Sequence, residues 1–129
     1  MDPAELIHEV GRRWNAGDFE GMLDLYTDDV LMTPSPSWPE SVQLKGKDAF
    51  RKNTEEWLEI WKSVELETHG VQAYGDRVVA HGCWRSTGRA SGVEGTMPIH
   101  MVLTVRDGKI ARLEWYPDNE RAVAAARGA

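Results

Sequence analysis

The chain has 129 residues, 41% of them hydrophobic and 28% charged, a composition typical of one folded globular domain. Its 21 acidic and 15 basic residues give a formal net charge of −6, and the basic residues are scattered, which disfavours a nucleic-acid partner. The single cysteine excludes an internal disulfide, and no stretch is apolar enough to span a membrane. Because the N-terminus carries charges where a signal peptide is apolar, we expect a cytoplasmic protein.

Two helices are expected at the start of the chain. Asp2, Pro3 and Glu5 form an N-terminal capping pattern, and apolar residues then recur at helical spacing until Gly17. Asp18 can cap a short second helix.

A third helix is expected over residues 47–61. A short extended segment at 30–33 and the proline-rich loop "PSPSWPES" precede it. The apolar stripe of this helix contains Ala49, Phe50, Asn53, Trp57 and Trp61.

The apolar period changes to two after residue 64, which predicts strands at 64–74, 77–87, 96–106 and 110–116. The connections "YGDR", "GRASGVEG" and "RDGK" are typical of turns and loops, so successive strands form an antiparallel meander. Residues 118–129 are expected to be a short helix or a frayed tail. Helices followed by strands predict a single α+β domain over residues 1–129, with a small-molecule cavity between a curved antiparallel sheet and the third helix.

Several phrases, in this order, resemble one known family. They are "WNAGDFEGMLDLYTDDVLMTP", "GKDAF", "GDRVVA", "VRDGKIARLEWYPD" and "NERAVAAA". Together they resemble the SnoaL-like proteins of the nuclear transport factor 2-like (ketosteroid isomerase-like) superfamily, over nearly the whole chain. The resemblance implies a cystatin-like fold: a cone-shaped curved antiparallel sheet wrapped by about three N-terminal helices, with a deep apolar pocket, often dimeric through the outer sheet face. The superfamily includes isomerases, polyketide cyclases, dehydratases and members without known activity, so the pocket residues must decide the function.

The resemblance also suggests two catalytic candidates. Counted back from the "DGKI" hairpin, His100 falls where ketosteroid isomerase has a protonated aspartate that donates to the enolate oxygen, which implies that His100 points into the pocket. The general base and the oxyanion tyrosine of that enzyme align with Thr33 and Val10, so ketosteroid isomerase chemistry is not expected. SnoaL-like cyclases use an aspartate as acid and base, and "EWYPD" resembles the end of their last strand, which makes Asp118 the second candidate.

Each candidate has an alternative interpretation. His100 is either a pocket donor and proton shuttle or a structural histidine whose nitrogens are paired within the fold. Asp118 is either a base or the cap of a terminal helix. The expected pocket lining consists of Trp14, Tyr26, Trp57, Trp61, His81, Val102, Leu113 and Trp115.

No metal or cofactor is expected. The histidines show no characteristic ligand spacing, His8 and His69 are expected to be ordinary exposed residues, and Cys83 lacks an obvious activating neighbour. The leading hypothesis is therefore a homodimer that binds a small, flat, apolar metabolite, with cofactor-free isomerisation, cyclisation or dehydration by His100 and Asp118. The alternative is a non-catalytic ligand-binding or dimerisation module of the same fold.

Overall fold

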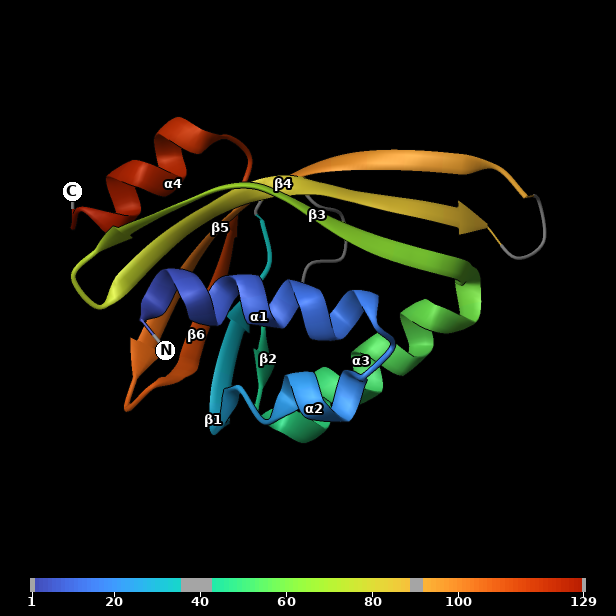
Figure 1. The fold of residues 1–129 in the computed structure, drawn as a ribbon, viewed down its shortest axis with the longest axis horizontal. Coiled ribbons are helices and arrows are strands. Elements are labelled where there is room, and N and C mark those ends of the chain that lie inside the picture. Colours follow the sequence, from blue (N-terminus) through green and yellow to red (C-terminus); the bar gives the residue numbers. More distant parts are fainter. Residues whose placement is uncertain (1, 36–42, 89–91, 129) are drawn as a thin grey trace.

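A computed structural model describes residues 2–35, 43–88 and 92–128. The chain runs through α1 (Pro3–Asn15), α2 (Phe19–Leu23), β1 (Tyr26–Thr33), β2 (Leu44–Lys45), α3 (Lys47–Ile60), β3 (Trp61–Tyr74), β4 (Arg77–Gly88), β5 (Glu94–Arg106), β6 (Lys109–Tyr116) and α4 (Asn119–Ala126). This is the predicted α+β domain, with three helices before the long strands (Figure 1). Most of the proline-rich loop, including Trp38, lies outside the described residues.

α1 begins and ends as its sequence predicts. The Asp2 side chain accepts a hydrogen bond from the backbone N–H of Glu5 at 2.8 Å, and Pro3 occupies the first helical position, where its missing N–H costs nothing. The helix gives way at Gly17, whose φ of 78° is a left-handed conformation that glycine adopts without steric cost. The buried face of α1, with Leu6, Ile7 and Val10, packs on the sheet.

The sheet has six strands in the order β2-β1-β6-β5-β4-β3. The predicted antiparallel meander of β3 to β6 is confirmed by the pairing of each successive pair of strands. The expectation of a wholly antiparallel sheet is wrong in one place, because β1 runs parallel to β6. A parallel pair needs a long crossover connection, and here β2, α3 and the strands β3 to β5 form it.

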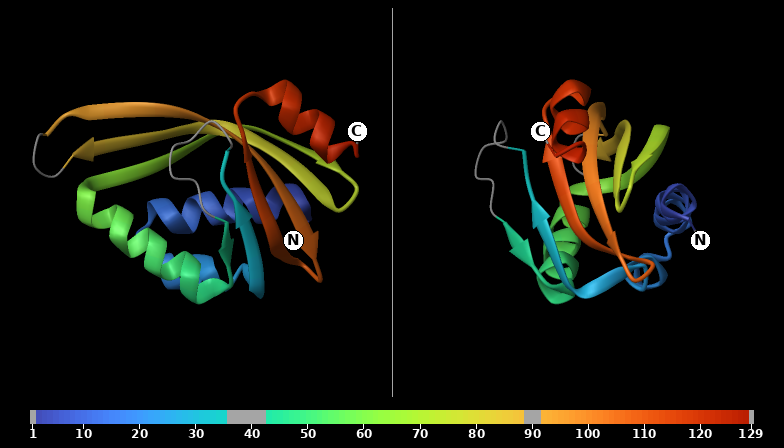
Figure 2. Two further views of the ribbon diagram at one scale, coloured as in Figure 1. Left: turned by 180° about the vertical axis from the view of Figure 1, so that it is seen from behind. Right: turned by 90° about the vertical axis from the view of Figure 1, so that its left-hand side faces the viewer.

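The long strands arch over α1 and α3, so the sheet has a concave and a convex face (Figures 1 and 2). Alternate residues point to opposite faces, and the concave face of β5 carries Ile99, Met101 and Leu103 in the main apolar core. The convex face is partly covered by α4, where Val79 and Val102 pack against Ala122 and Ala126 in a second apolar cluster. The terminal segment is therefore a docked helix.

β3 forms one edge of the sheet, and α1 is fastened to it by side chains. The Asn15 amide donates to the carbonyl of Leu66 and accepts from its N–H, both at 2.8 Å, and the indole of Trp14 donates to the carbonyl of Val64 at 3.0 Å. These bonds satisfy backbone groups at an otherwise open edge. They also fix α1 as a rigid wall beside the concave face.

None of the described helices is both long enough and apolar enough to cross a membrane.

Candidate functional site

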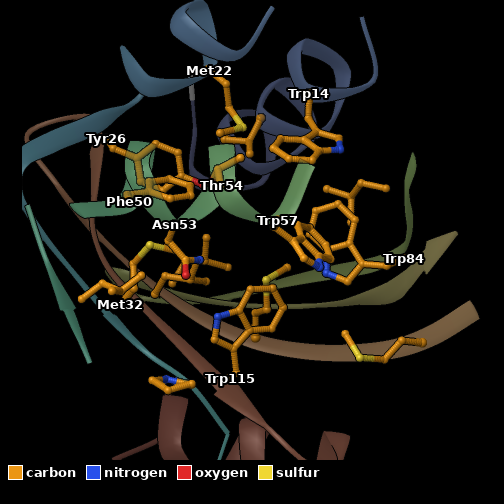
Figure 3. A pocket seen from close by; sticks show the side chains of 18 of the residues that line it. Trp14, Met22, Tyr26, Met32, Phe50, Asn53, Thr54, Trp57, Trp84 and Trp115 are labelled. Carbon is orange, nitrogen blue, oxygen red and sulfur yellow. The ribbon is translucent and has the colours of Figure 1, made fainter. Parts of the chain in front are cut away.

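A cavity of about 640 Å³ lies between the concave face of the sheet and α1 and α3. This volume falls in the usual range of small-molecule sites. Most of its lining is apolar, and Figure 3 shows tryptophans approaching it from α1, α3, β4 and β6. The described aromatic residues that line it are Trp14, Tyr26, Phe50, Trp57, Trp84 and Trp115.

Three indoles form one wall of the cavity. The ring of Trp84 lies 5.4 Å from that of Trp14 and 5.3 Å from that of Trp57, centroid to centroid, with interplanar angles of 65° and 81°. Edge-to-face contacts of this kind favour a defined packing of the rings. Because Trp14 is also held by its hydrogen bond to Val64, the wall is built before any ligand enters.

Tyr26 and Phe50 form a second aromatic pair, with centroids 5.2 Å apart. Tyr26 is only 3% exposed and lines the cavity. Burial raises the pKa of this phenol well above its ordinary value, because the phenolate would be poorly solvated. Tyr26 therefore keeps its proton at neutral pH and can donate a hydrogen bond beside the cavity.

The cavity opens between α3 and the first part of β5. Ile60 and Met97 line it while being 63% and 38% exposed, and Asn53 and Glu56 add polar groups from the exposed side of α3. Glu56 is the one carboxylate among the described lining residues. The exposed polar groups, Asn53 and Glu56, lie at this mouth, while Tyr26 and Thr54 are buried and Thr68 is half-buried.

Five of the predicted lining residues do line the cavity: Trp14, Tyr26, Trp57, Leu113 and Trp115. Trp61, His81 and Val102 are absent from its described lining. Trp61 differs because α3 ends at Ile60, so that Trp61 has extended backbone angles and pairs with Gly88 in the sheet. His81 and Val102 lie on the convex face, opposite in strand phase to the lining residues Trp84 and Met101.

The prediction that His100 points into the cavity is wrong. Its neighbours Met101 and Leu103 take the concave side, and His100 shares the convex side with Val102. There its ring stacks on that of His81, and its buried Nδ1 has no hydrogen-bond partner among the described residues. Both faces of β5 are apolar because α4 covers part of the convex face, so alternation alone could not tell which face is the inner one.

Asp118 is also absent from the described lining. It caps α4, with Oδ1 accepting from the backbone N–H of Arg121 at 2.8 Å. The capping interpretation given by the sequence is confirmed. The structure does not bring His100 and Asp118 together in the cavity.

The lining includes residues that the sequence analysis did not select. Trp84 lies on the face of β4 opposite His81, and period-two alternation within residues 77–87 was the signal for it. Phe50 and Asn53 were on the predicted stripe of α3 but were not assigned to the cavity. The cavity also recruits Met22, Met32 and Met101, whose flexible thioethers adapt to irregular space.

Comparisons with known proteins agree with this architecture. Residues 7–113 match the family model described as the SnoaL-like domain. No curated protein matches the chain.

Three of the similar solved structures match the chain over most of its length. An NTF2-like protein of unknown function from Burkholderia pseudomallei is 18% identical, with a TM-score of 0.77, and the match covers 98% of this chain and 97% of that one. TerC, co-crystallised with polyporic acid, is 22% identical with a TM-score of 0.77, and 98% of each chain is covered. A candidate SnoaL-like polyketide cyclase from Mesorhizobium loti is 26% identical with a TM-score of 0.69, covering 90% of this chain and 99% of that one. The first two likenesses, at these identities, concern the fold alone.

Proposed function

The chain belongs to the SnoaL-like domain family, and we propose that its cavity binds a small, flat, largely apolar molecule carrying a hydrogen-bond acceptor. The observation that carries this proposal is the cavity of about 640 Å³ with aromatic walls on several sides. Ligand burial in such a site is driven by the removal of apolar surface from water, and the wall of Trp14, Trp57 and Trp84 favours planar groups that pack against indoles.

Tyr26 supplies the polar anchor of the proposed site. A hydroxyl that lines an apolar cavity loses its hydrogen bonds with water when a ligand displaces that water, and a ligand oxygen placed beside it restores one of them. A hydroxyl, carbonyl or quinone oxygen would serve. The raised pKa of Tyr26 means that it donates a hydrogen bond to this oxygen rather than releasing its proton.

The non-catalytic alternative is favoured because the candidate bases do not lie inside the cavity. Isomerisation, cyclisation and dehydration each need a base next to the substrate. The two candidates, His100 and Asp118, lie away from the described lining, and Glu56 lies at the exposed mouth. A reaction in this cavity would therefore depend on Tyr26 and Glu56.

Ligand screening tests the proposal. We would measure thermal shift and tryptophan fluorescence with planar aromatic phenols and quinones, including polyporic acid, with which the structural neighbour TerC was co-crystallised. Trp57→Ala removes part of the aromatic wall, and Trp61→Ala is the matched control, since Trp61 lies four residues on and outside the described lining. We expect Trp57→Ala to weaken binding at least about tenfold, which corresponds to about 1.4 kcal/mol, and Trp61→Ala to leave it nearly unchanged.

Two results would contradict the proposal. One is that no compound in the screen shows saturable binding. The other is that Trp61→Ala weakens binding and Trp57→Ala does not. Mass spectrometry of each bound compound after incubation separates binding from turnover. A product whose formation is lost in Tyr26→Phe or Glu56→Gln would favour the enzyme over the binding protein.

We also propose that the chain forms a homodimer through the part of the convex sheet face that α4 leaves uncovered. α4 packs over Val79 and Val102, while Pro98 on β5 stays exposed. Sedimentation velocity of the native chain and of Pro98→Glu tests this arrangement. A dimer that Pro98→Glu weakens supports it, and a monomer at all concentrations contradicts it.

A further inference from the structure

Three side chains of types that bind metals meet on the convex face of the sheet, on the side away from the cavity. They are Glu67 and His69 on β3 and Cys83 on β4. Each offers one ligand atom, and these three atoms all lie within 4.8 Å of one another. The group lies outside the cavity and has no part in the proposed ligand binding. It adjoins the part of the convex face proposed for the dimer, because Cys83 is paired with Pro98.

The pairing of β3 with β4 explains why these residues meet. Glu67 and Cys83 are directly paired across the two antiparallel strands. The register then shifts between Thr68 and Gly70, which leaves His69 as the extra residue of a β-bulge. The bulge turns the imidazole of His69 back toward Glu67, so that Nε2 lies 2.9 Å from Oε1.

Gly82 permits the close approach of the two strands at this point. A Cβ atom at position 82 would lie 1.9 Å from the backbone carbonyl oxygen of Glu67, which no side chain can accommodate without moving the strand. The backbone geometry that brings Cys83 close to Glu67 and His69 therefore depends on the glycine at position 82. It does not depend on the rotamer of a surface side chain.

We propose that Glu67, His69 and Cys83 bind one zinc-class divalent cation. A thiolate, an imidazole and a carboxylate are the three ligand types that Zn²⁺ takes in proteins, and a thiolate disfavours Mg²⁺ and Ca²⁺. In a tetrahedral site with metal–ligand distances of about 2.0–2.3 Å, ligand atoms lie roughly 3.3–3.8 Å apart. The Glu67 and His69 side chains are 42% and 47% exposed, which leaves them room to rotate toward these separations.

The charges of the ligand atoms suit a dication. Glu67 and a Cys83 thiolate together supply two negative charges. Arg85 contacts the other carboxylate oxygen of Glu67, Oε2, at 2.8 Å, which leaves Oε1 for the metal. Arg85 also hydrogen-bonds the Cys83 side chain, so Cys83 has a cationic neighbour that the sequence did not predict, and the metal would displace this contact. The cation would take the place of the His69–Glu67 hydrogen bond.

The fourth coordination position is left for water or for a neighbouring histidine. His81 is the nearest imidazole, its ring centroid 6.4 Å from that of His69, and its Nε2 lies over Gly70. The spacing of residues along the sequence predicts no metal site, because the ligands come from two strands. The bulge and the register that bring them together cannot be seen in the order of residues.

Metal titration of the untagged chain, under reducing conditions, tests the proposal. We would titrate Zn²⁺ by calorimetry and Co²⁺ by absorption, since thiolate–cobalt charge transfer reports coordination by sulfur directly. The variants are Cys83→Ser and His69→Ala, with His8→Ala as the matched control for an exposed histidine on α1. Circular dichroism checks that each variant is folded.

We expect one Zn²⁺ per chain and a cobalt charge-transfer band that Cys83→Ser abolishes. Each ligand substitution should weaken Zn²⁺ binding by about tenfold or more, and His8→Ala should leave it unchanged. The proposal is overturned if folded native chain binds no Zn²⁺ at micromolar concentrations, or if binding survives both Cys83→Ser and His69→Ala.

Discussion

His81 and His100 lie directly opposite each other on β4 and β5, with ring centroids 6.5 Å apart and planes 21° apart. The pair sits on the convex face, back to back with the cavity-lining residues of the same strands. Nδ1 of His100 is buried there without a hydrogen-bond partner among the described residues. A polar atom in that state lowers the stability of the fold, because its interaction with water is lost and not replaced.

Replacing His100 with leucine should therefore separate a structural role from a role in ligand binding. We expect His100→Leu to raise the free energy of unfolding by about 1 kcal/mol, since the unpaired nitrogen is removed. Its affinity for anilinonaphthalene sulfonate, an apolar fluorescent probe, should stay within about twofold of the native value because His100 does not line the cavity. Urea denaturation and fluorescence titration measure the two quantities. A large fall in probe affinity would instead show that His100 contributes to the binding site.

Much of the fold follows from local patterns in the sequence. The Asp2-Pro3 start of α1 and the period-two runs around the "RDGK" turn depend on neighbouring residues only, and both are found where they were expected. The parallel pairing of β1 with β6 depends on contacts between distant segments, and no local pattern encodes it.

The site was harder to predict than the fold for the same reason. Trp14 and Trp57 were found because helical stripes identify a buried face. A strand that is apolar on both faces gives no such direction, and β5 is apolar on both faces because α4 covers one of them. Trp61 was misplaced by the position of a single boundary, since one residue beyond the end of α3 the side chain follows the phase of a strand.

Asp118 offers a clear test between a capping and a catalytic role. Asp118→Ala removes the acceptor for the N–H of Arg121 and should lower the free energy of unfolding by about 1 kcal/mol. Asp118→Asn keeps a side-chain oxygen and should retain most of this stability, since asparagine caps helices as well as aspartate does. Thermal or urea denaturation of both variants decides the matter. Equal destabilisation by the two substitutions would show that the charge, not the cap, matters.

The hydrogen bond from Trp14 to Val64 connects the cavity wall to the sheet edge. Trp14→Phe keeps an aromatic ring but leaves the carbonyl of Val64 without its donor. We expect a loss of about 1 kcal/mol in stability and a modest loss of affinity for anilinonaphthalene sulfonate. Phe19→Leu is a control, because Phe19 contacts Trp14 edge-on but does not line the cavity within the described residues. If Trp14→Phe is as stable as the native chain, the bond does not hold α1 in place.

The buried hydroxyl of Tyr26 should make the fold sensitive to alkali. In the unfolded chain a tyrosine loses its proton near pH 10, whereas burial keeps Tyr26 protonated in the folded chain to a distinctly higher pH. Between these two pKa values the folded state binds one more proton than the unfolded state, so the free energy of unfolding falls as the pH rises. Below both pKa values the group is protonated in both states and contributes no pH dependence.

Tyr26→Phe removes this one contribution. Its free energy of unfolding should therefore fall less steeply above about pH 10 than that of the native chain, by up to about 1.4 kcal/mol per pH unit. Urea denaturation of both proteins at several values between about pH 8 and about pH 11 measures the difference. Parallel curves for the two proteins would mean that Tyr26 ionises as readily in the fold as in the unfolded chain. In that event water already reaches the hydroxyl. The proposal that Tyr26 acts as an uncharged hydrogen-bond donor to a ligand oxygen would then lack support.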